Sequence, residues 1–248
     1  MVSRFHVRLT PQMNHFDYLE SHIPDLKKRR ILDLGSGRGK FLFYCIARGV
    51  SATGLEINPE YISITHDKAR AQGVTVNIVE GAGEKLPFAN ESFDFINISE
   101  VIEHVNDPTQ MLSEVWRVLS KDGCAYLSVP NRFGIKDPHF HLYFVNWLPR
   151  SLVATYISIR GKHKDYGEER AGHQRLDEMH YYTYSGVGNL LGTHGFSHQD
   201  QRVLRIKSAV KNSLLGAVAQ MLYLPFRFFV FDSFHILLKK ETPNTFPA

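Results

Sequence analysis

The chain has 248 residues, and its 43% hydrophobic and 22% charged content is typical of a globular protein and excludes disordered, collagen-like and disulfide-scaffold classes. This length fits one large α/β domain with insertions, and we expect a single domain over residues 1–248. The net charge is only +4, but residues 131–248 hold 15 of the 29 basic and 9 of the 25 acidic residues. This excess of basic residues fits an anionic substrate, an anionic lipid surface or a solvated basic face.

Two features bear on the compartment. Cys45 and Cys124 each lie within an apolar run, which predicts buried free thiols in a reducing environment rather than a disulfide. The first six residues lack the apolar core of a secretory signal. We therefore expect a cytoplasmic protein.

Predicted strands and helices alternate through the first 130 residues. Apolar or β-branched runs predict strands over residues 31–34, 52–57, 74–79, 93–98 and 125–129. Helices are expected over residues 40–48, 59–72 and 108–119, because glycine or proline marks their ends. This alternation predicts an α/β fold with a doubly wound, Rossmann-like, mostly parallel sheet, whose ligand crevice lies at the carboxyl ends of the strands.

Regular structure is expected to break after Pro130. A stretch rich in His, Pro and aromatic residues predicts an inserted substrate cap over residues 131–183. A helix over residues 184–193 and strands over residues 196–206 and 233–239 follow, which completes a seven-stranded sheet. The last two strands are separated by an apolar insertion, residues 208–231.

Two interpretations of this insertion remain open. Gln220, Pro225 and Arg227 interrupt an apolar run barely long enough to cross a bilayer, which disfavours a transmembrane helix. The segment either packs as core against the cap or lies on a membrane, with nearby basic residues facing anionic headgroups. These basic residues are Arg202, Arg205, Lys207 and Lys211. An interfacial helix predicts exposed side chains at Leu222, Phe226 and Phe229.

A glycine-rich turn carries the first chemical signal. The run Asp33-Leu34-Gly35-Ser36-Gly37-Arg38-Gly39 follows a predicted strand and precedes a helix, where glycines let the backbone approach a ligand. Glu56 ends the next strand, where a carboxylate can accept both hydroxyls of a ribose. The spacing G-x-G-x-G disfavours a dinucleotide, because the third glycine falls one residue early for a pyrophosphate loop.

Five segments in order now resemble one family. They are residues 31–39 (ILDLGSGRG), 54–58 (GLEIN), 84–88 (EKLPF), 92–96 (SFDFI) and 114–119 (EVWRVL). Their order over residues 30–130 resembles that of class I S-adenosylmethionine-dependent methyltransferases, in the group that methylates small molecules and lipid precursors, such as the ubiquinone-biosynthesis O-methyltransferases.

The resemblance implies a set of roles in binding S-adenosylmethionine. Asp33 would orient the methionine amino group, and Glu56 would hold the ribose. Family members often have an Asp near the adenine amine where this chain has Ala82, so backbone or Glu84 would substitute. Residues 97–100 would lie beside the methyl sulfonium. The implied cofactor-binding residues are Asp33, Gly35, Gly37, Gly39, Glu56, Ala82, Gly83, Glu84 and Ser99.

The run Glu100-Val101-Ile102-Glu103-His104 suggests a metal site. In a helical turn or tight loop this spacing brings two carboxylates and an imidazole toward one cation. The run resembles the metal-binding segment of ubiquinone-biosynthesis O-methyltransferases and of small-RNA 2′-O-methyltransferases, where a later histidine completes the site. That resemblance implies Mg²⁺ or a similar divalent cation held by Glu100, Glu103, His104 and His180. Alternatively, His104 acts as a general base or only begins a helix.

Methyl transfer to a hydroxyl also requires removal of a proton. His104 is the first candidate base, and His139 and His141 of the predicted cap are the second, because histidine titrates near neutral pH. Each of these residues has a surface or structural role as its alternative.

The sequence therefore predicts a methyltransferase, with O-methylation of a hydrophobic or glycan- or lipid-linked small molecule as the expected reaction. Metal-assisted RNA 2′-O-methylation and a non-catalytic cofactor-binding protein are the alternatives. The small basic excess and the lack of a recognisable RNA-binding appendage disfavour RNA, and nothing in the sequence indicates DNA. Besides the small-molecule acceptor, the expected partner is a membrane surface, contacted peripherally through residues 208–231. The oligomeric state is not predicted.

Overall fold

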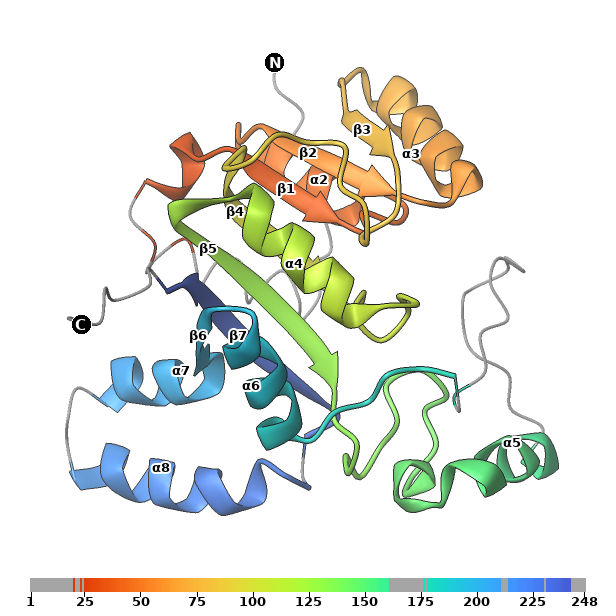
Figure 1. The fold of residues 1–248 in the computed structure, drawn as a ribbon, viewed down its shortest axis with the longest axis vertical. Coiled ribbons are helices and arrows are strands. Elements are labelled where there is room, and N and C mark those ends of the chain that lie inside the picture. Colours follow the sequence, from red (N-terminus) through yellow and green to blue (C-terminus); the bar gives the residue numbers. More distant parts are fainter. Residues whose placement is uncertain are drawn as a thin grey trace, which may run out of the picture. The chain divides into compact units, whose positions relative to one another are not determined.

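The computed structural model describes residues 20, 23, 25–160, 176, 178–210, 214–229 and 231–241 (Figure 1). Seven strands form one sheet in the order β3-β2-β1-β4-β5-β7-β6. The expected seven-stranded, mostly parallel sheet flanked by helices is confirmed. The strands are β1 (Ile31–Leu34), β2 (Ala52–Glu56), β3 (Asn77–Glu80), β4 (Phe93–Ser99), β5 (Leu119–Pro130), β6 (Phe196–Asp200) and β7 (Ser233–Lys240).

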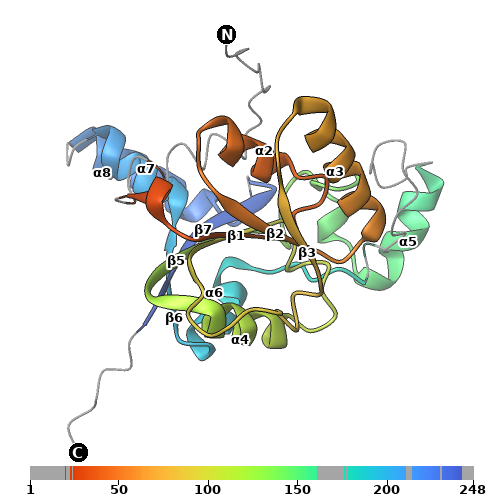
Figure 2. The same cartoon turned by 90° about the horizontal axis from the view of Figure 1, so that it is seen from above.

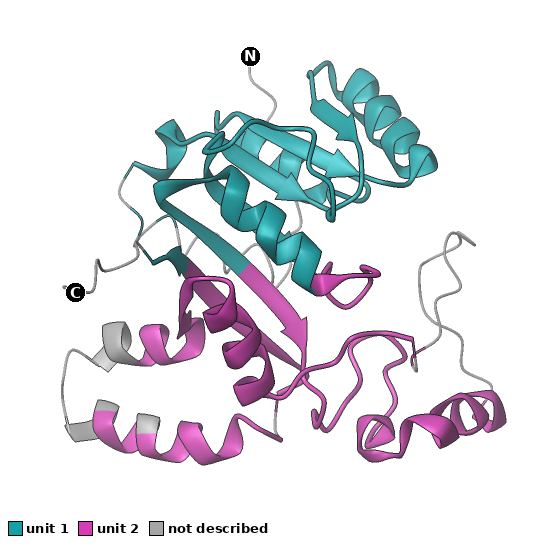
Figure 3. Cartoon of the chain, viewed as in Figure 1, with its two compact units in different colours: residues 1–99, 109–126, 239–248 teal, residues 100–108, 127–238 magenta. Residues whose placement is uncertain are grey.

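The chain divides into two compact units, which Figure 3 shows in different colours. The first unit comprises residues 1–99, 109–126 and 239–248, and the second comprises residues 100–108 and 127–238. Strands β5 and β7 contribute to both units. The single domain and the cap at residues 131–183 stay predictions, and residues 161–175 and 177 of that cap lie outside the described residues.

The first unit is built on parallel strands. β1 pairs with β2 and β4, and β2 pairs with β3, all in parallel. Helices α2 (Lys40–Ala47) and α3 (Pro59–Gln72) lie on one face of these strands and α4 (Pro108–Val118) lies on the other, as Figure 2 shows. A short 3-10 helix, η1 (Leu26–Lys28), precedes β1. Cys45 and Cys124 are buried free thiols in this unit, as predicted.

Local chemistry explains where α3 begins and ends. The side chain of Asn58 accepts a hydrogen bond from the backbone N–H of Glu60, and Pro59 occupies the first turn. Gly73 ends the helix with a φ of 64°, and the N–H of Val74 donates to Ala69 O. Because Val74 is used to close the helix, β3 begins only at Asn77, three residues later than predicted.

Two of the family segments are joined by hydrogen bonds from one ion pair. Arg117 on α4 binds Glu114 and donates to the backbone carbonyls of Leu86 and Phe88. Glu114 accepts in turn from the N–H of Leu86, and its contact with Arg117 lowers its pKa. This network fixes α4 to the loop of residues 84–88, so these residues have a structural role.

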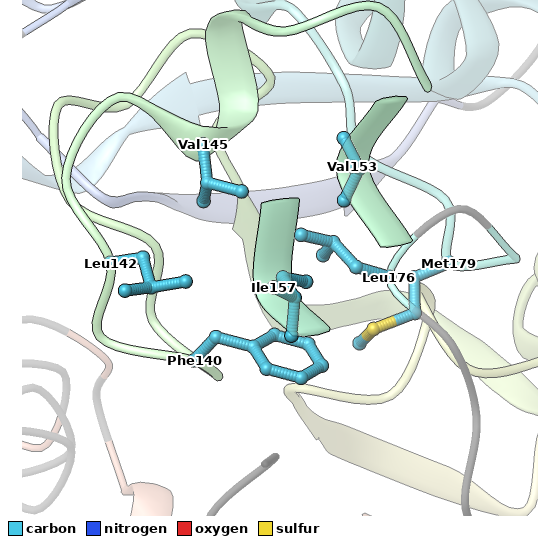
Figure 4. Packing of buried hydrophobic residues seen from close by; sticks show 7 residues of the cluster. All are labelled: Phe140, Leu142, Val145, Val153, Ile157, Leu176 and Met179. Carbon is cyan, nitrogen blue, oxygen red and sulfur yellow. The ribbon is translucent and has the colours of Figure 1, made fainter. Parts of the chain in front are cut away.

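The second unit contains its own apolar core. Its helices are η2 (Val145–Trp147), α5 (Arg150–Ile159), α6 (Tyr184–Thr193), α7 (Gln201–Val210) and α8 (Leu214–Phe226). One core cluster joins α5 and η2 to the loops on either side, and Figure 4 shows its side chains pointing toward one another. Its members are Phe140, Leu142, Val145, Val153, Ile157, Leu176 and Met179.

The strand predicted over residues 196–206 is wrong beyond Asp200. There β6 ends and α7 begins, because the Asp200 carboxylate accepts a hydrogen bond from the N–H of Arg202 and so caps the new helix. Its second oxygen accepts from the Tyr223 hydroxyl of α8 at 2.6 Å. The predicted insertion at residues 208–231 thus consists largely of α8, and its residues 211–213 and 230 lie outside the described residues.

Candidate functional site

The glycine turn lies between β1 and α2. Gly35, Gly37 and Gly39 all have positive φ values, of 69°, 52° and 75°. A side chain at Gly39 would collide with the methyl group of Thr65 on α3, whereas the space where a Gly37 side chain would lie is open. Gly39 is therefore required for packing, and Gly37 leaves a space that a ligand can enter.

Glu56, at the carboxyl end of β2, faces this turn. Its Oε2 accepts from the N–H of Gly37 at 2.7 Å, and its Oε1 accepts from the N–H groups of Ile57 and Asn58 at 3.0 and 2.9 Å. The side chain is buried. Three backbone donors thus hold the Glu56 carboxylate beside the glycine turn.

Asp33, on β1, is held from the neighbouring strand. Asn97 on β4 donates from Nδ2 to Asp33 Oδ1 at 2.7 Å, and Ser99 donates to Asn97 Oδ1 at 3.0 Å. Burial raises the pKa of Asp33 to about 7. The hydrogen bond from Asn97 lowers this pKa, and the nearby Glu56 carboxylate raises it further. The hydrogen bond between Asn97 and Asp33 was not predicted, because it depends on the register of β1 against β4.

These groups fit S-adenosylmethionine. Ser36 Oγ is buried without a hydrogen-bond partner and lies against Gly54 on β2. Asp33 and Glu56 lie near the carboxyl ends of adjacent parallel strands, the position where this fold binds ligands. The two carboxylates match a ligand that has an amino group and a ribose. The unpaired hydroxyl and the open glycine leave a hydrogen bond and space for it.

The residues predicted to contact adenine follow β3. Glu80 is in register with Glu56, and the next residue, Gly81, donates its N–H to Glu56 O at 3.0 Å. The predicted contacts Ala82, Gly83 and Glu84 follow directly. A side chain at Gly83 would lie 3.1 Å from Met111 Cγ on α4, so packing favours glycine there. No Asp stands in this segment.

The second unit holds a separate group of titratable side chains. Glu103 is fully buried, and its Oε1 lies 3.4 Å from His139 Nε2 and 4.0 Å from His104 Nε2. The two imidazoles pack edge to face, with centroids 5.3 Å apart. His104 has 30% of its side chain exposed and His139 only 11%. A buried carboxylate with two imidazoles can store a proton or bind a cation.

Asp137 and Tyr181 support this group. Asp137 Oδ1 accepts from the N–H groups of His139 and Phe140, at 2.9 and 2.6 Å. Its Oδ2 accepts from the Tyr181 hydroxyl at 2.8 Å. Burial first, and then the Asp137 carboxylate, raise the pKa of Tyr181 well above its usual value, so Tyr181 stays a neutral donor. Sequence analysis gave Asp137 no role, although an Asp directly before Pro is a known turn signal.

The structure does not assemble the metal ligands as predicted. Among the described residues, the ligand atoms of Glu103, His104 and His139 lie within 4.8 Å of one another, and neither Glu100 nor His180 joins them. Glu100 is exposed with a φ of 57°, and its N–H donates to Ser128 Oγ. His180 contributes its backbone, with its N–H donating to Glu103 O at 3.0 Å.

The structure brings together only two of the three predicted general bases. His104 and His139 belong to the group around Glu103, and His141 does not. His141 is exposed, has a φ of 55° and donates its N–H to Asp137 O. We define the acceptor-side group as Glu103, His104 and His139, supported by Asp137 and Tyr181.

Comparison with known proteins agrees with the fold. Residues 32–127 match the family described as "Methyltransferase domain". The chain is 32% identical over 126 residues to a demethylmenaquinone methyltransferase of Deinococcus radiodurans, covering 49% of this chain and 52% of the relative. It is 30% identical over 142 residues to a ubiquinone biosynthesis O-methyltransferase of Azorhizobium caulinodans, covering 56% of each. The chain thus spans about half the length of these curated relatives.

Structural similarity extends further than sequence similarity. The crystal structure of the YcgJ protein from Bacillus subtilis has a TM-score of 0.59 at 17% identity, covering 92% of this chain and 99% of that one. At this identity the similarity concerns the fold alone. In its fold and over residues 32–127, the chain resembles class I S-adenosylmethionine-dependent methyltransferases. The curated relatives that match this part of the chain are named for menaquinone and ubiquinone biosynthesis.

Proposed function

We propose that this protein transfers the methyl group of S-adenosylmethionine to a hydroxyl of a hydrophobic or lipid- or glycan-linked small molecule. The acceptor-side group carries the proposal, because a buried carboxylate with two imidazoles suits removal of a hydroxyl proton. The names of the two curated relatives, which refer to menaquinone and ubiquinone, support an acceptor with a ring and a long apolar tail.

In this proposal the first unit binds the cofactor, which supplies an electrophilic methyl group on sulfur. Asp33, ionised by the approach of a cationic amino group, would pair with that group. Glu56 would accept from the ribose hydroxyls, exchanging part of its bonding to backbone N–H groups. Ser36 Oγ would gain the hydrogen-bond partner that it lacks.

The second unit would handle the proton. S-adenosylmethionine would supply the methyl group, and an imidazole of the acceptor-side group would take the proton that the acceptor hydroxyl loses. His104 is the first choice, because it is the more exposed of the two histidines. The Glu103 carboxylate would stabilise the imidazolium that forms, and Asp137 would hold the loop that carries His139.

A divalent cation is the second proposal for the same residues. Two imidazoles and a carboxylate with ligand atoms within 4.8 Å of one another form a donor set that such cations accept. A cation there would lower the pKa of an acceptor hydroxyl directly. The test is the metal content of the purified protein together with its activity after dialysis against chelator. Full activity in metal-free protein contradicts the cation and leaves the imidazole mechanism.

Two measurements test the main proposal in order. Calorimetry should show binding of S-adenosylmethionine and of its demethylated product, with dissociation constants between about 1 μM and 0.1 mM. A screen of phenolic and lipid-linked acceptors with isotopically labelled cofactor should then find transfer. The absence of binding by folded protein would contradict the cofactor site. Binding without transfer to any acceptor would favour the non-catalytic alternative.

A further inference from the structure

Exposed apolar side chains concentrate in the second unit. In the described part of the chain, the exposed large apolar residues lie in this unit, with Ile57 as the exception. Met221 is 76% exposed, Leu222 59% and Phe226 56%, although α8 contains no charged residue. We define the exposed apolar surface as Tyr143, Phe144, Trp147, Met221, Leu222, Phe226 and Phe229.

Residues distant in sequence are joined in this surface. The rings of Trp147 and Phe229 lie 5.6 Å apart, and Phe144 packs on Trp147 at 6.3 Å. The N–H of Ile135 donates to Phe229 O, and the N–H of Phe144 donates to Ile135 O, so the backbone joins the same segments. Phe229 N–H donates to Phe226 O at the end of α8. The loop of residues 133–147 and the end of α8 are therefore held together.

Charge favours one kind of partner. In the sequence, residues 138–164 and 201–231 contain no Asp or Glu, although Asp137, Asp200 and Asp232 border them, and the residues of this surface come from these two segments. Their basic residues are Arg150, Arg160, Lys162, Lys164, Arg202, Arg205, Lys207, Lys211 and Arg227. Just before the first segment, exposed Lys136 places its Nζ 5.9 Å from the Tyr143 ring. Apolar and aromatic side chains from segments that carry basic but no acidic residues match an anionic bilayer, where each Lys or Arg near the surface contributes about 1 kcal/mol.

We propose that the exposed apolar surface docks the protein on an anionic lipid bilayer. Leu222, Phe226 and Phe229, which the sequence identified as the test of an interfacial helix, are all exposed. None of the described helices has the length and apolar character needed to cross a membrane, so contact would be peripheral. Aromatic rings from two segments extend the surface beyond α8 alone. This proposal does not depend on methyl transfer.

The direct test is vesicle flotation. We expect the full chain to float with vesicles of equal parts phosphatidylcholine and phosphatidylserine, and less with phosphatidylcholine alone. Raising salt should weaken flotation, because screening reduces the attraction of basic residues to the headgroups. Trp147 provides a second readout: in a Trp116→Phe background, anionic vesicles should shift its emission to the blue and protect it from acrylamide.

Matched variants separate this surface from exposed apolar area in general. Met221→Gln/Leu222→Gln keeps good helix formers and should lower the vesicle partition coefficient about tenfold or more. Phe226→Ser/Phe229→Ser should act in the same direction. Ile57→Gln removes a side chain of similar exposure, 65%, from the first unit and should leave flotation unchanged. Circular dichroism verifies that each variant is folded.

Three results would overturn the proposal. One is the absence of flotation and of any Trp147 shift with anionic vesicles. Another is equal flotation of the wild type and both double variants. The third is a dimer, seen by light scattering, that dissociates in Met221→Gln/Leu222→Gln while vesicle binding is absent. That outcome would assign the surface to a second copy of the chain.

Discussion

The cofactor residues of the first unit and the acceptor-side group of the second unit are built in different ways. Asp33, Glu56 and the glycine turn are held by hydrogen bonds to backbone or to the next strand, within residues 33–99. The acceptor-side group joins Glu103 to His139, and Tyr181 supports it by donating to Asp137; these residues come from separate loops. A regular sheet positions the first site, whereas the second depends on loop conformation and on buried polar side chains.

This difference has a functional consequence. A sheet edge can bind one common cofactor in many proteins, because its geometry follows from strand register. Loops can change while that edge is kept, which allows different acceptors. The two sites should therefore respond differently to substitution: changes in the first unit should alter cofactor affinity, and changes in the acceptor-side group should alter turnover.

The largest expected effect is on turnover. His104→Gln should lower kcat by about 10²- to 10⁴-fold, the range of general-base catalysis, and leave cofactor affinity unchanged. Initial rates with labelled cofactor and calorimetry give the two quantities. His66→Gln, at an exposed position on α3, is the matched control and should keep full activity. Loss of cofactor binding in His104→Gln would contradict the separation of roles.

The next effect concerns stability against pH. Because the folded-state pKa of Asp33 is raised to about 7, the folded protein holds a proton that the unfolded chain releases near pH 4. Ionisation of Asp33 therefore destabilises the fold progressively from about pH 4 to pH 7. Asp33→Asn should be more stable than the wild type at pH 8, by up to about 4 kcal/mol, and little different at pH 4.5.

Urea unfolding at both pH values measures this difference. The hydrogen bond from Asn97 Nδ2 can persist, because the amide oxygen that Asp33→Asn introduces can still accept it. A stability difference that does not change with pH would show that Asp33 is ionised throughout. The same variant should bind the cofactor weakly, because it lacks the charge that pairs with the amino group.

A smaller effect is expected at Glu56. Glu56→Ala removes the acceptor of three backbone N–H groups and the proposed ribose ligand, and should weaken cofactor binding by about 2–3 kcal/mol, roughly 30- to 150-fold. Glu60→Ala, at an exposed position in the first turn of α3, should bind normally. Equal affinities of the two variants would argue against Glu56 as a ligand.

The same contrast explains what the sequence could predict. The alternation of strands and helices, the glycine turn and Glu56 follow from local periodicity and from motifs within one segment. The group around His139 does not, because it depends on a buried contact between residues 103 and 139 that no local pattern specifies. The helix at residues 201–210 was missed for a similar reason: Asp200 caps it while also binding Tyr223, a residue 23 positions later.

The smallest expected effect tests the support of the acceptor-side group. Tyr181→Phe removes the hydroxyl that donates to Asp137 Oδ2, which should lower the free energy of unfolding by about 1 kcal/mol. Asp137 Oδ1 keeps its bonds to the N–H groups of His139 and Phe140, so the loop should hold its place and the loss should stay small. Because the pKa of Tyr181 is raised above its usual value, the hydroxyl stays protonated and the loss should be equal at pH 6 and pH 9.

Urea unfolding of a matched pair isolates this contribution. Tyr143→Phe, at an exposed position in the same unit, is the control and should change stability by less than about 0.5 kcal/mol. Equal unfolding free energies for Tyr181→Phe and Tyr143→Phe would mean that Asp137 is held by its backbone donors alone, and that the acceptor-side group needs no support from Tyr181.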